Sequence, residues 1–253
     1  MLVSAPPLHL CGRFPAGRPF VAIVGSRGAS GQGMERARGL AADLAARGAV
    51  IVSGGAIGID AAAHAGSGGR TVAVLASGLD RPYPARNAAL FAEIVAAGGA
   101  LASPFPDGTD VRPWQFLRRN EVIAALVEAV VVVEARARSG ALHTARAAAK
   151  LRKIVGACPG SPGTDALLAA GAAAIATADD VTAALAGTPR QLPQRAPAAG
   201  DEAAAWGALS GAADADTVAA RAGISVVRAA RALTALELDG LALPLPGGRW
   251  VRA

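Results

Sequence analysis

The fold is decided by the stretch Phe20-Val-Ala-Ile-Val-Gly-Ser-Arg27, which is followed by a helical segment at 34–47 and by the run Ala49-Val-Ile-Val-Ser-Gly-Gly-Ala-Ile-Gly-Ile-Asp60. Both apolar runs are short, rich in β-branched residues and end in small residues, which is typical of buried strands. The segment between them places Ala37, Leu40 and Leu44 on one side at helical spacing. The stretch therefore predicts a βαβ unit with parallel strands.

The loops that follow these two strands carry candidate binding residues. In an open parallel sheet, the loops at the carboxyl ends of the strands line the ligand crevice, where unpaired N–H groups at helix starts favour an anion. The first loop holds Gly25, Ser26 and Arg27, and the guanidinium group of Arg27 suits a phosphate. The second loop begins Ser53-Gly54-Gly55, and its glycines allow the backbone to form a nest of N–H groups. We expect both loops to contact phosphates.

Two further segments extend this candidate site. The segment Trp114-Gln-Phe-Leu-Arg-Arg-Asn-Glu121 puts two arginines and an amide beside aromatic rings. Arginines bind phosphates, asparagine reads base edges and aromatic rings stack on bases; the alternative is that the rings anchor a loop in the core while the arginines are solvated. The segment Ser139-Gly-Ala-Leu-His-Thr144 follows a valine-rich strand, so Ser139 and the N–H group of Gly140 are also phosphate candidates.

Several enzyme classes lack their motifs in this chain. Arg36 stands where the third glycine of a dinucleotide-binding fingerprint belongs, and no P-loop Gly-Lys-Ser/Thr occurs. The three histidines are scattered without a carboxylate or thiol cluster, and no Gly-x-Ser-x-Gly elbow follows a strand. Asp60 and His64 lie four residues apart on a predicted helix, where a hydrogen-bonded surface pair is favoured over a catalytic dyad. We therefore expect no enzymatic activity, no cofactor and no metal.

The composition indicates an anionic partner. The chain has 253 residues and a formal net charge of +6. Nucleic acid is the commonest partner of such a basic protein, although arginine-rich, alanine-rich chains also become basic through compositional drift. The two cysteines form neither a disulfide framework nor a metal cluster, and neither a signal peptide nor a membrane span is visible. We expect a cytoplasmic protein without a membrane partner.

The chain divides into four parts. Residues 1–18, rich in proline and glycine, are expected to form an irregular arm, and 19–188 alternate strand and helix patterns around a parallel sheet covered on both faces. Three prolines mark 189–200 as a linker, and 201–253 predict three helices and a hairpin, a winged-helix arrangement. The tail has a net charge of −1 and the rest +7, so a protein contact for the tail is as plausible as duplex DNA.

Taken in order, the motifs resemble those of the DprA/Smf family (DNA-processing protein A). The resemblance runs from about Pro6 to Ala186, and the tail resembles the winged-helix module of many members. The matching stretches are Val21–Arg27, Ile51–Asp60 with Ala63-His64, Val72–Asp80 with Tyr83-Pro84 and Asn87, Arg118–Asn120, Val131–Ala135, Ser139-Gly140 with Thr144-Ala145, and Pro159-Gly160 with Gly163-Thr164.

The resemblance implies an extended Rossmann-type domain that binds single-stranded DNA and forms a homodimer. It also implies that the protein loads the RecA recombinase onto incoming DNA in natural transformation and recombination. Arg27 would be the key phosphate contact, and Arg118, Arg119 and Asn120 would hold the strand. The implied DNA-binding set is Gly25, Ser26, Arg27, Ser53, Gly54, Gly55, Arg118, Arg119, Asn120, Ser139, Gly140 and Thr144.

The chain departs from the family pattern in three places. Glu121 stands where the family has a further arginine, the segment Ser103-Pro-Phe-Pro106 lacks the family's glutamate, and the helical N-terminal domain of many members is not seen. The alternative function is a nucleotide-binding sensor or a phosphoribohydrolase-like enzyme of the related Rossmann superfamily, whose Pro-Gly-Gly-x-Gly-Thr motif ends in a catalytic glutamate. Here Pro159-Gly-Ser-Pro-Gly-Thr164 is followed by Asp165-Ala-Leu-Leu, with no glutamate in place.

Overall fold

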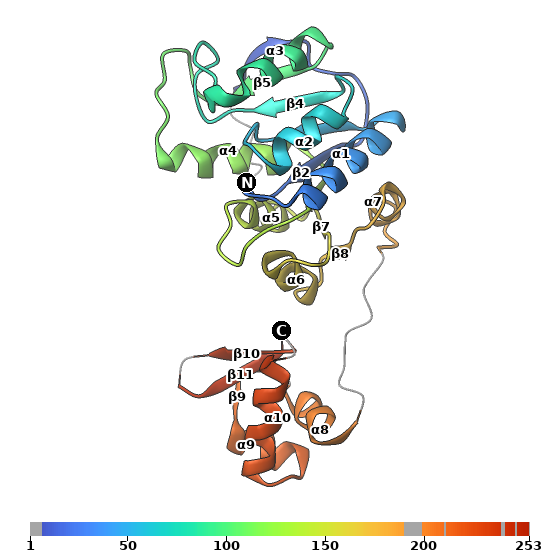
Figure 1. Ribbon diagram of the computed structural model, residues 1–253, viewed down its shortest axis with the longest axis vertical. Coiled ribbons are helices and arrows are strands. Elements are labelled where there is room, and N and C mark those ends of the chain that lie inside the picture. The colour runs from blue at the N-terminus through green and yellow to red at the C-terminus, as the bar shows by residue number, and fades with distance from the viewer. Residues whose placement is uncertain (1–6, 190–198, 210, 239–240, 246, 253) are drawn as a thin grey trace. The chain divides into compact units, whose positions relative to one another are not determined.

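The chain forms two compact units, Met1–Gln191 and Leu192–Ala253, shown in Figure 1. The computed structural model describes residues 7–189, 199–209, 211–238, 241–245 and 247–252. Most of the linker expected at 189–200 lies outside the described residues, as does the start of the arm expected at 1–18. These two boundaries stay predictions.

The first unit is built on an eight-stranded sheet in the order β1-β5-β4-β3-β2-β6-β7-β8. The seven strands β2 to β8 all pair in parallel. In this sheet only β1 runs antiparallel, beside β5. The parallel sheet predicted from the sequence is thus confirmed, whereas β1 replaces part of the irregular arm and β8 was not expected. The strands are β1 (His9–Gly12), β2 (Phe20–Val24), β3 (Val50–Ser53), β4 (Thr71–Val74), β5 (Ala100–Ser103), β6 (Ala129–Val132), β7 (Ile154–Ala157) and β8 (Ala173–Ala174).

Helices cover both faces of this sheet, because its central strands are apolar on both sides. In β2, Val21 and Ile23 pack into one core, and Ala22 and Val24 pack into the other. The first face carries α1 (Gly31–Ala46), α2 (Ile59–Gly66), α3 (Ala88–Ala96) and α7 (Ala178–Leu185). The second face carries α4 (Pro113–Leu126), α5 (Ala141–Lys150) and α6 (Pro162–Ala169).

The direction in which the chain adds strands reverses at β2. From β2 the chain adds β3, β4 and β5 on one side, and it then returns to place β6 on the other side of β2, with Val24 opposite Val132. The helices that follow β2 and β6 cover opposite faces, so the loops leading to them diverge. An open α/β sheet binds its ligand at such a reversal.

His64 of α2 is buried as a neutral imidazole. The Thr71 hydroxyl donates to the carbonyl oxygen of Ile51 (2.8 Å), so its oxygen accepts from Nδ1 of His64 (2.7 Å). Nε2 of His64 has no hydrogen-bond partner in the described part of the chain. Burial lowers the pKa of His64 to about 3, and the positive charge of Arg119 acts in the same direction.

Acid is therefore expected to destabilise the first unit through His64. At pH values below 6.5, the His64 side chain is protonated in the unfolded chain, whereas in the folded chain it stays neutral down to about pH 3. The free energy of unfolding should fall by up to about 1.4 kcal/mol for each pH unit below 6.5 because of this group. Urea unfolding of the wild type and of His64→Gln at several pH values measures the difference. His143→Gln, at an exposed position of α5, is the control; equal pH slopes for the wild type and His64→Gln would contradict the assignment.

The second unit is a winged-helix domain, as predicted. It contains α8 (Gly200–Ala208), β9 (Ala213–Asp214), α9 (Ala215–Ala222), α10 (Val226–Leu238), β10 (Ala242–Leu245) and β11 (Arg249–Arg252). Two arginines serve the unit itself: Arg228 forms an ion pair with Asp201, and the guanidinium group of Arg252 lies 4.0 Å from the centre of the Trp206 ring.

Candidate nucleic-acid interface

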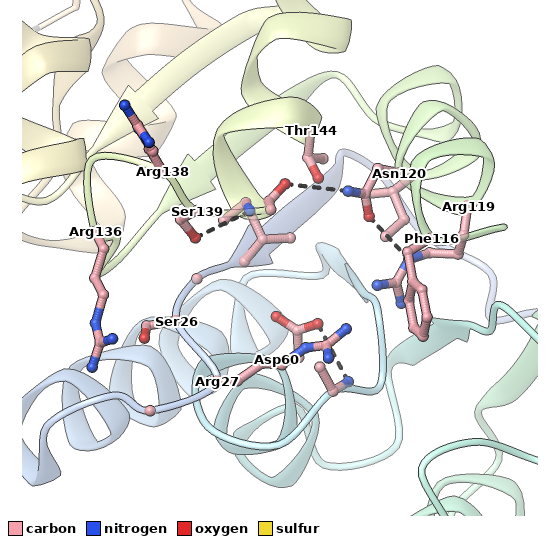
Figure 2. Close-up of a pocket in the computed structure, with 17 residues that line it drawn as sticks. Ser26, Arg27, Asp60, Phe116, Arg119, Asn120, Arg136, Arg138, Ser139 and Thr144 are labelled. Atoms are coloured by element: carbon pink, nitrogen blue, oxygen red, sulfur yellow. Dashed lines mark hydrogen bonds between the residues drawn. The ribbon is translucent and has the colours of Figure 1, made fainter. Parts of the chain in front are cut away.

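A pocket of about 550 Å³ opens at the reversal point, and Figure 2 shows its lining. Its walls come from the loop after β2, from α2, from one side of α4, and from the loop between β6 and α5. We call it the phosphate pocket because of the side chains described next. It is lined by Val24, Gly25, Ser26, Arg27, Gly28, Ala56, Asp60, Phe116, Arg119, Asn120, Ile123, Arg136, Arg138, Ser139, Gly140, Ala141 and Thr144.

The loops after β2 and β6 meet at the edge of this pocket. The N–H group of Ser26 donates to the carbonyl oxygen of Glu134 (2.7 Å). The N–H group of Ile59 donates to the carbonyl oxygen of Ser26 (3.2 Å). A β-carbon on Gly25 would lie 2.6 Å from Cγ1 of Ile59 and 2.8 Å from the carbonyl oxygen of Glu134. Glycine is therefore needed at position 25 for the loops to approach each other.

The start of α1 is occupied by a carboxylate of the chain itself. Glu134 accepts from the backbone N–H group (3.1 Å) and the hydroxyl (2.6 Å) of Ser30, and that hydroxyl accepts from the N–H group of Gly33. The sequence indicated that N–H groups at this helix start would bind phosphate. The anion that they favour is Glu134 instead, so phosphate binding at the pocket has to depend on other groups.

Arginines supply those groups. Arg27, Arg119, Arg136 and Arg138 line the pocket, and Asp60 is its one carboxylate among the described residues. The exposed Arg27 side chain places its guanidinium carbon 4.9 Å from the centre of the Phe116 ring, which is a cation–π contact. The pocket therefore carries excess positive charge.

Arg136 and Arg138 were not singled out from the sequence. They stand in the loop between the buried strand β6 and the Ser139-Gly140 segment that starts α5. That is the arrangement that identified Arg27, an arginine between a strand and the next helix. The same criterion, applied to this loop, finds both residues.

Arg119 is buried and joins three elements. Its Nη1 donates to the carbonyl oxygens of Gly54 and of Val74 (3.1 Å), and its Nε donates to Oδ1 of Asn120 (3.0 Å). Asn120 in turn donates through Nδ2 to the carbonyl oxygen of Gly140 (3.2 Å). Arg119 and Asn120 together thus connect α4 to the ends of β3 and β4 and to the start of α5. These hydrogen bonds hold the wall of the pocket in place.

Asp60 and Arg119 influence each other's ionisation inside this wall. Burial raises the pKa of Asp60, and the positive charge of Arg119 partly opposes that rise. Burial lowers the pKa of Arg119 and the negative charge of Asp60 opposes that change, while arginine stays protonated in proteins at neutral pH. The expected surface pair of Asp60 with His64 is wrong, because both side chains are buried and His64 bonds to Thr71.

The structure brings most of the predicted site residues together but separates four of them from the phosphate pocket. Ser53 is fully buried and donates to the carbonyl oxygen of Ile23 (2.6 Å). Gly54 lies under the Arg119 guanidinium group, and Gly55 packs against the Phe91 ring. Arg118 points to the outer side of α4, where it pairs with Glu121 (3.0 Å). The eight that line the pocket are Gly25, Ser26, Arg27, Arg119, Asn120, Ser139, Gly140 and Thr144.

A second, smaller pocket of about 190 Å³ adjoins the first. The two share Arg27, Ala56, Phe116 and Arg119, so Arg27 stands on the boundary between them. The second pocket also includes Gly54 and the exposed side chains of Tyr83 and Arg86. Of the two aromatic residues of α4 considered above, Phe116 lines both pockets and Trp114 lines neither.

The segment that would carry the catalytic glutamate of a phosphoribohydrolase lies outside both pockets. Thr164 is buried and bonds to Ser161, and Asp165 accepts from the N–H group of Gly160 (2.9 Å). Within the described ranges, no three His, Cys, Asp or Glu side chains are grouped to hold a metal ion, and no helix is long and apolar enough to cross a membrane.

The fold and the site together define the class of protein. It is an α/β protein of Rossmann type with an arginine-lined pocket at the reversal of a parallel sheet, followed by a winged-helix unit. Comparison with known proteins then gives the family. Residues 3–186 match the family DNA recombination-mediator protein A, and residues 188–248 match the DprA winged helix domain. The chain belongs to the DprA/Smf family.

Individual relatives agree with this assignment. A DprA relative from Mycobacterium tuberculosis is 41% identical over 254 residues, which cover 90% of this chain and 63% of that protein. The DNA processing protein DprA of Bacillus subtilis is 38% identical over 170 residues, which cover 64% of this chain and 57% of that protein. The chain therefore spans less than two thirds of the length of these relatives.

Two solved structures share the fold of the first unit. DNA processing protein A from Helicobacter pylori, whose single-stranded DNA binding mode has been described, superimposes with a TM-score of 0.68 at 30% identity, covering 75% of this chain and 91% of that one. DprA from Streptococcus pneumoniae superimposes with a TM-score of 0.64 at 35% identity, covering 70% of this chain and 65% of that one.

Proposed function

We propose that this chain binds single-stranded DNA through the phosphate pocket and the adjoining second pocket. One observation carries the proposal. The two adjoining pockets bring together four exposed arginines that have no ion-pair partner among the described residues. Unpaired guanidinium groups around a concave site favour a polyanion. These four arginines are Arg27, Arg86, Arg136 and Arg138.

The binding of single strands rather than duplex follows from the shape of the site. Duplex DNA is commonly held by a helix in its major groove and by contacts to both backbones, whereas a narrow pocket accepts groups that project from one strand. The winged-helix unit, which could supply such a helix, uses Arg228 and Arg252 for internal contacts. The described DNA binding of the H. pylori relative supports the same choice.

Affinity for single-stranded DNA is expected to fall as salt rises. For single strands, the slope of log K against log salt is about −0.7 per phosphate engaged, so two to four phosphates give a slope of about −1.4 to −2.8. Fluorescence anisotropy of labelled oligo-dT, titrated across a salt series, measures it. A duplex of equal length is the comparison and should bind more weakly. A slope near zero, or tighter binding of the duplex, would contradict the proposal.

We further propose that the bound strand is handed to the RecA recombinase, as the family resemblance implies, in natural transformation and recombination. The family that residues 3–186 match, DNA recombination-mediator protein A, supports this role by its name. Assembly of RecA filaments on oligonucleotides covered by single-strand binding protein, with and without this chain, tests it; an unchanged rate counts against it. We also propose a homodimer, which light scattering would show as twice the chain mass of 24.9 kDa.

A further inference from the structure

The second pocket ends at the ring of Tyr83, the one tyrosine of the chain. This ring is 43% exposed and also lines a third hollow, together with Arg81, Pro82 and Asp110. It meets Phe116 edge-on, with 5.9 Å between the ring centres and an angle of 68° between the planes. Since Arg27 lies over the same Phe116 ring, Tyr83 is the next side chain in a row that begins at the phosphate pocket.

The loop that carries Tyr83 is held firmly at its base. The N–H group of Tyr83 donates to the buried hydroxyl of Ser77 (3.1 Å), and the Ser103 hydroxyl donates to the Ser77 carbonyl oxygen (2.7 Å). Just after Tyr83, the short helix η1 (Ala85–Asn87) is anchored by Asn87, whose Nδ2 donates to the carbonyl oxygen of Gly55 (2.9 Å).

A second set of bonds ties this loop to the loop after β5. Asp107 accepts from the N–H groups of Leu79 (3.0 Å) and Asp80 (3.2 Å), and Asp80 accepts from the N–H group of Gly108 (2.9 Å). The aromatic ring is therefore presented by a preorganised backbone. A ligand that stacks on it loses little conformational entropy in ordering the loop.

The charges around Tyr83 determine where a phosphate of the ligand is favoured. Arg86 lines the second pocket and has no ion-pair partner in the described part of the chain. In the third hollow, the single positive charge of Arg81 is shared between Asp80 (3.8 Å) and Asp110 (3.7 Å). A phosphate is therefore attracted to Arg86 in the second pocket and repelled by the excess negative charge of the third hollow.

We propose that Tyr83 is a stacking platform for a nucleobase outside the phosphate pocket, with Arg86 contacting the adjacent phosphate. The inference rests on the proposed binding of single-stranded DNA and extends that site by one base along the carboxyl edge of the sheet, from β3 towards β4. Stacking on an aromatic ring tolerates any base, so this platform adds affinity without sequence preference.

The first test separates stacking from support of Phe116. Tyr83→Ala should weaken binding of oligo-dT by about 5- to 150-fold, the range expected for one stacked base, and Tyr83→Phe should bind as the wild type does. An oligomer of equal length with abasic sugars keeps the phosphates but has no bases, so Tyr83→Ala should leave its binding unchanged. Arg27→Ala should weaken the binding of both oligomers, because it acts on phosphate.

The outcomes distinguish the two proposals. If the wild type binds neither oligomer, the proposed function fails. If Tyr83→Ala weakens binding of both oligomers equally, Tyr83 only positions Phe116 and Arg27, and the platform is overturned. If Tyr83→Ala changes neither while Arg27→Ala weakens both, the platform alone is overturned.

A second measurement locates the base directly. Oligo-dT that carries 5-iodouracil should crosslink to Tyr83 on irradiation, and the modified peptide is identified by mass spectrometry. Trp114→Ala is the matched control, because Trp114 is 58% exposed, packs edge-on against Phe105 and lines none of these hollows. Its removal should leave the crosslink and the affinity unchanged. A crosslink at Trp114 in place of Tyr83 would overturn the proposal.

Discussion

Replacement of Arg119 by methionine is expected to lower the free energy of unfolding of the first unit by about 3–5 kcal/mol, the usual cost of removing one partner of a buried charged pair. Methionine fills much of the same volume but donates no hydrogen bond. The carbonyl oxygens of Gly54 and Val74 lose their donor, and Asp60 keeps a buried carboxyl group without the compensating charge. Urea unfolding followed by circular dichroism measures the loss.

The neighbouring arginine supplies the control for this experiment. Arg118→Met removes an exposed side chain that pairs with Glu121 within one turn of α4, and such surface pairs contribute about 0.5 kcal/mol or less. The effect of Arg119→Met should also grow as the pH rises above 3.8, the ordinary pKa of Asp60. Without the positive charge of Arg119, the folded chain holds the proton of the buried Asp60 still more tightly than the unfolded chain does, so the variant loses stability as the pH rises. Equal losses for the two variants would contradict the role assigned to Arg119.

Replacement of Arg27 by alanine is expected to give a large loss of DNA binding. A charged hydrogen bond to phosphate contributes about 1–3 kcal/mol, so the affinity for oligo-dT should fall about 5- to 150-fold. Arg27 is exposed, and its one contact recorded among the described residues is with the Phe116 ring, so the fold should not change. Anisotropy titration at moderate salt measures the affinity, and a thermal melt checks the fold.

Two further variants separate the position of Arg27 from its charge. Arg38→Ala removes an equal charge from an exposed position of α1 that lines neither pocket, and it should change the affinity by less than about twofold. Arg27→Lys keeps the charge but not the planar fork, so its affinity should lie between those of the wild type and Arg27→Ala. Binding by Arg27→Ala at the wild-type level would remove the basis of the proposed site.

The sheet could be predicted because its strands are buried on both faces. The β-branched runs of β2, β3 and β6 are typical of strands buried on both faces, and the small residues after them mark where the loops begin. The short strands at the two edges give no such signal. In β1, His9–Gly12 is exposed and is specified by pairing with β5, which lies about ninety residues away. In β8, two alanines suffice because β7 provides the partner.

The candidate site could be predicted in part: eight of the twelve expected residues line the phosphate pocket, and the geometry of the chain keeps the other four out of it. Residues on one face of a helix recur at spacings of three and four, and Arg118 does not fit the spacing of the face that carries Arg119. The spacing of Phe116, Arg119, Asn120 and Ile123 identifies the face that lines the pocket. Ser53, Gly54 and Gly55 were expected in the site from the glycines of their loop and from the family resemblance. The sequence did not reveal that the buried Arg119 would fill the space above them, because that contact joins residues 65 positions apart.

The pairing of Glu134 with the first turn of α1 bears on which anions the protein can bind from a mixture. A helix start left open would collect inorganic phosphate, nucleotides and other small metabolites, and these would compete with the intended ligand. A tethered carboxylate at that position outcompetes them, since it is always present at high effective concentration. On the proposed function, selectivity for a long polymer over abundant small anions then comes from the number of arginines that one ligand can reach at once.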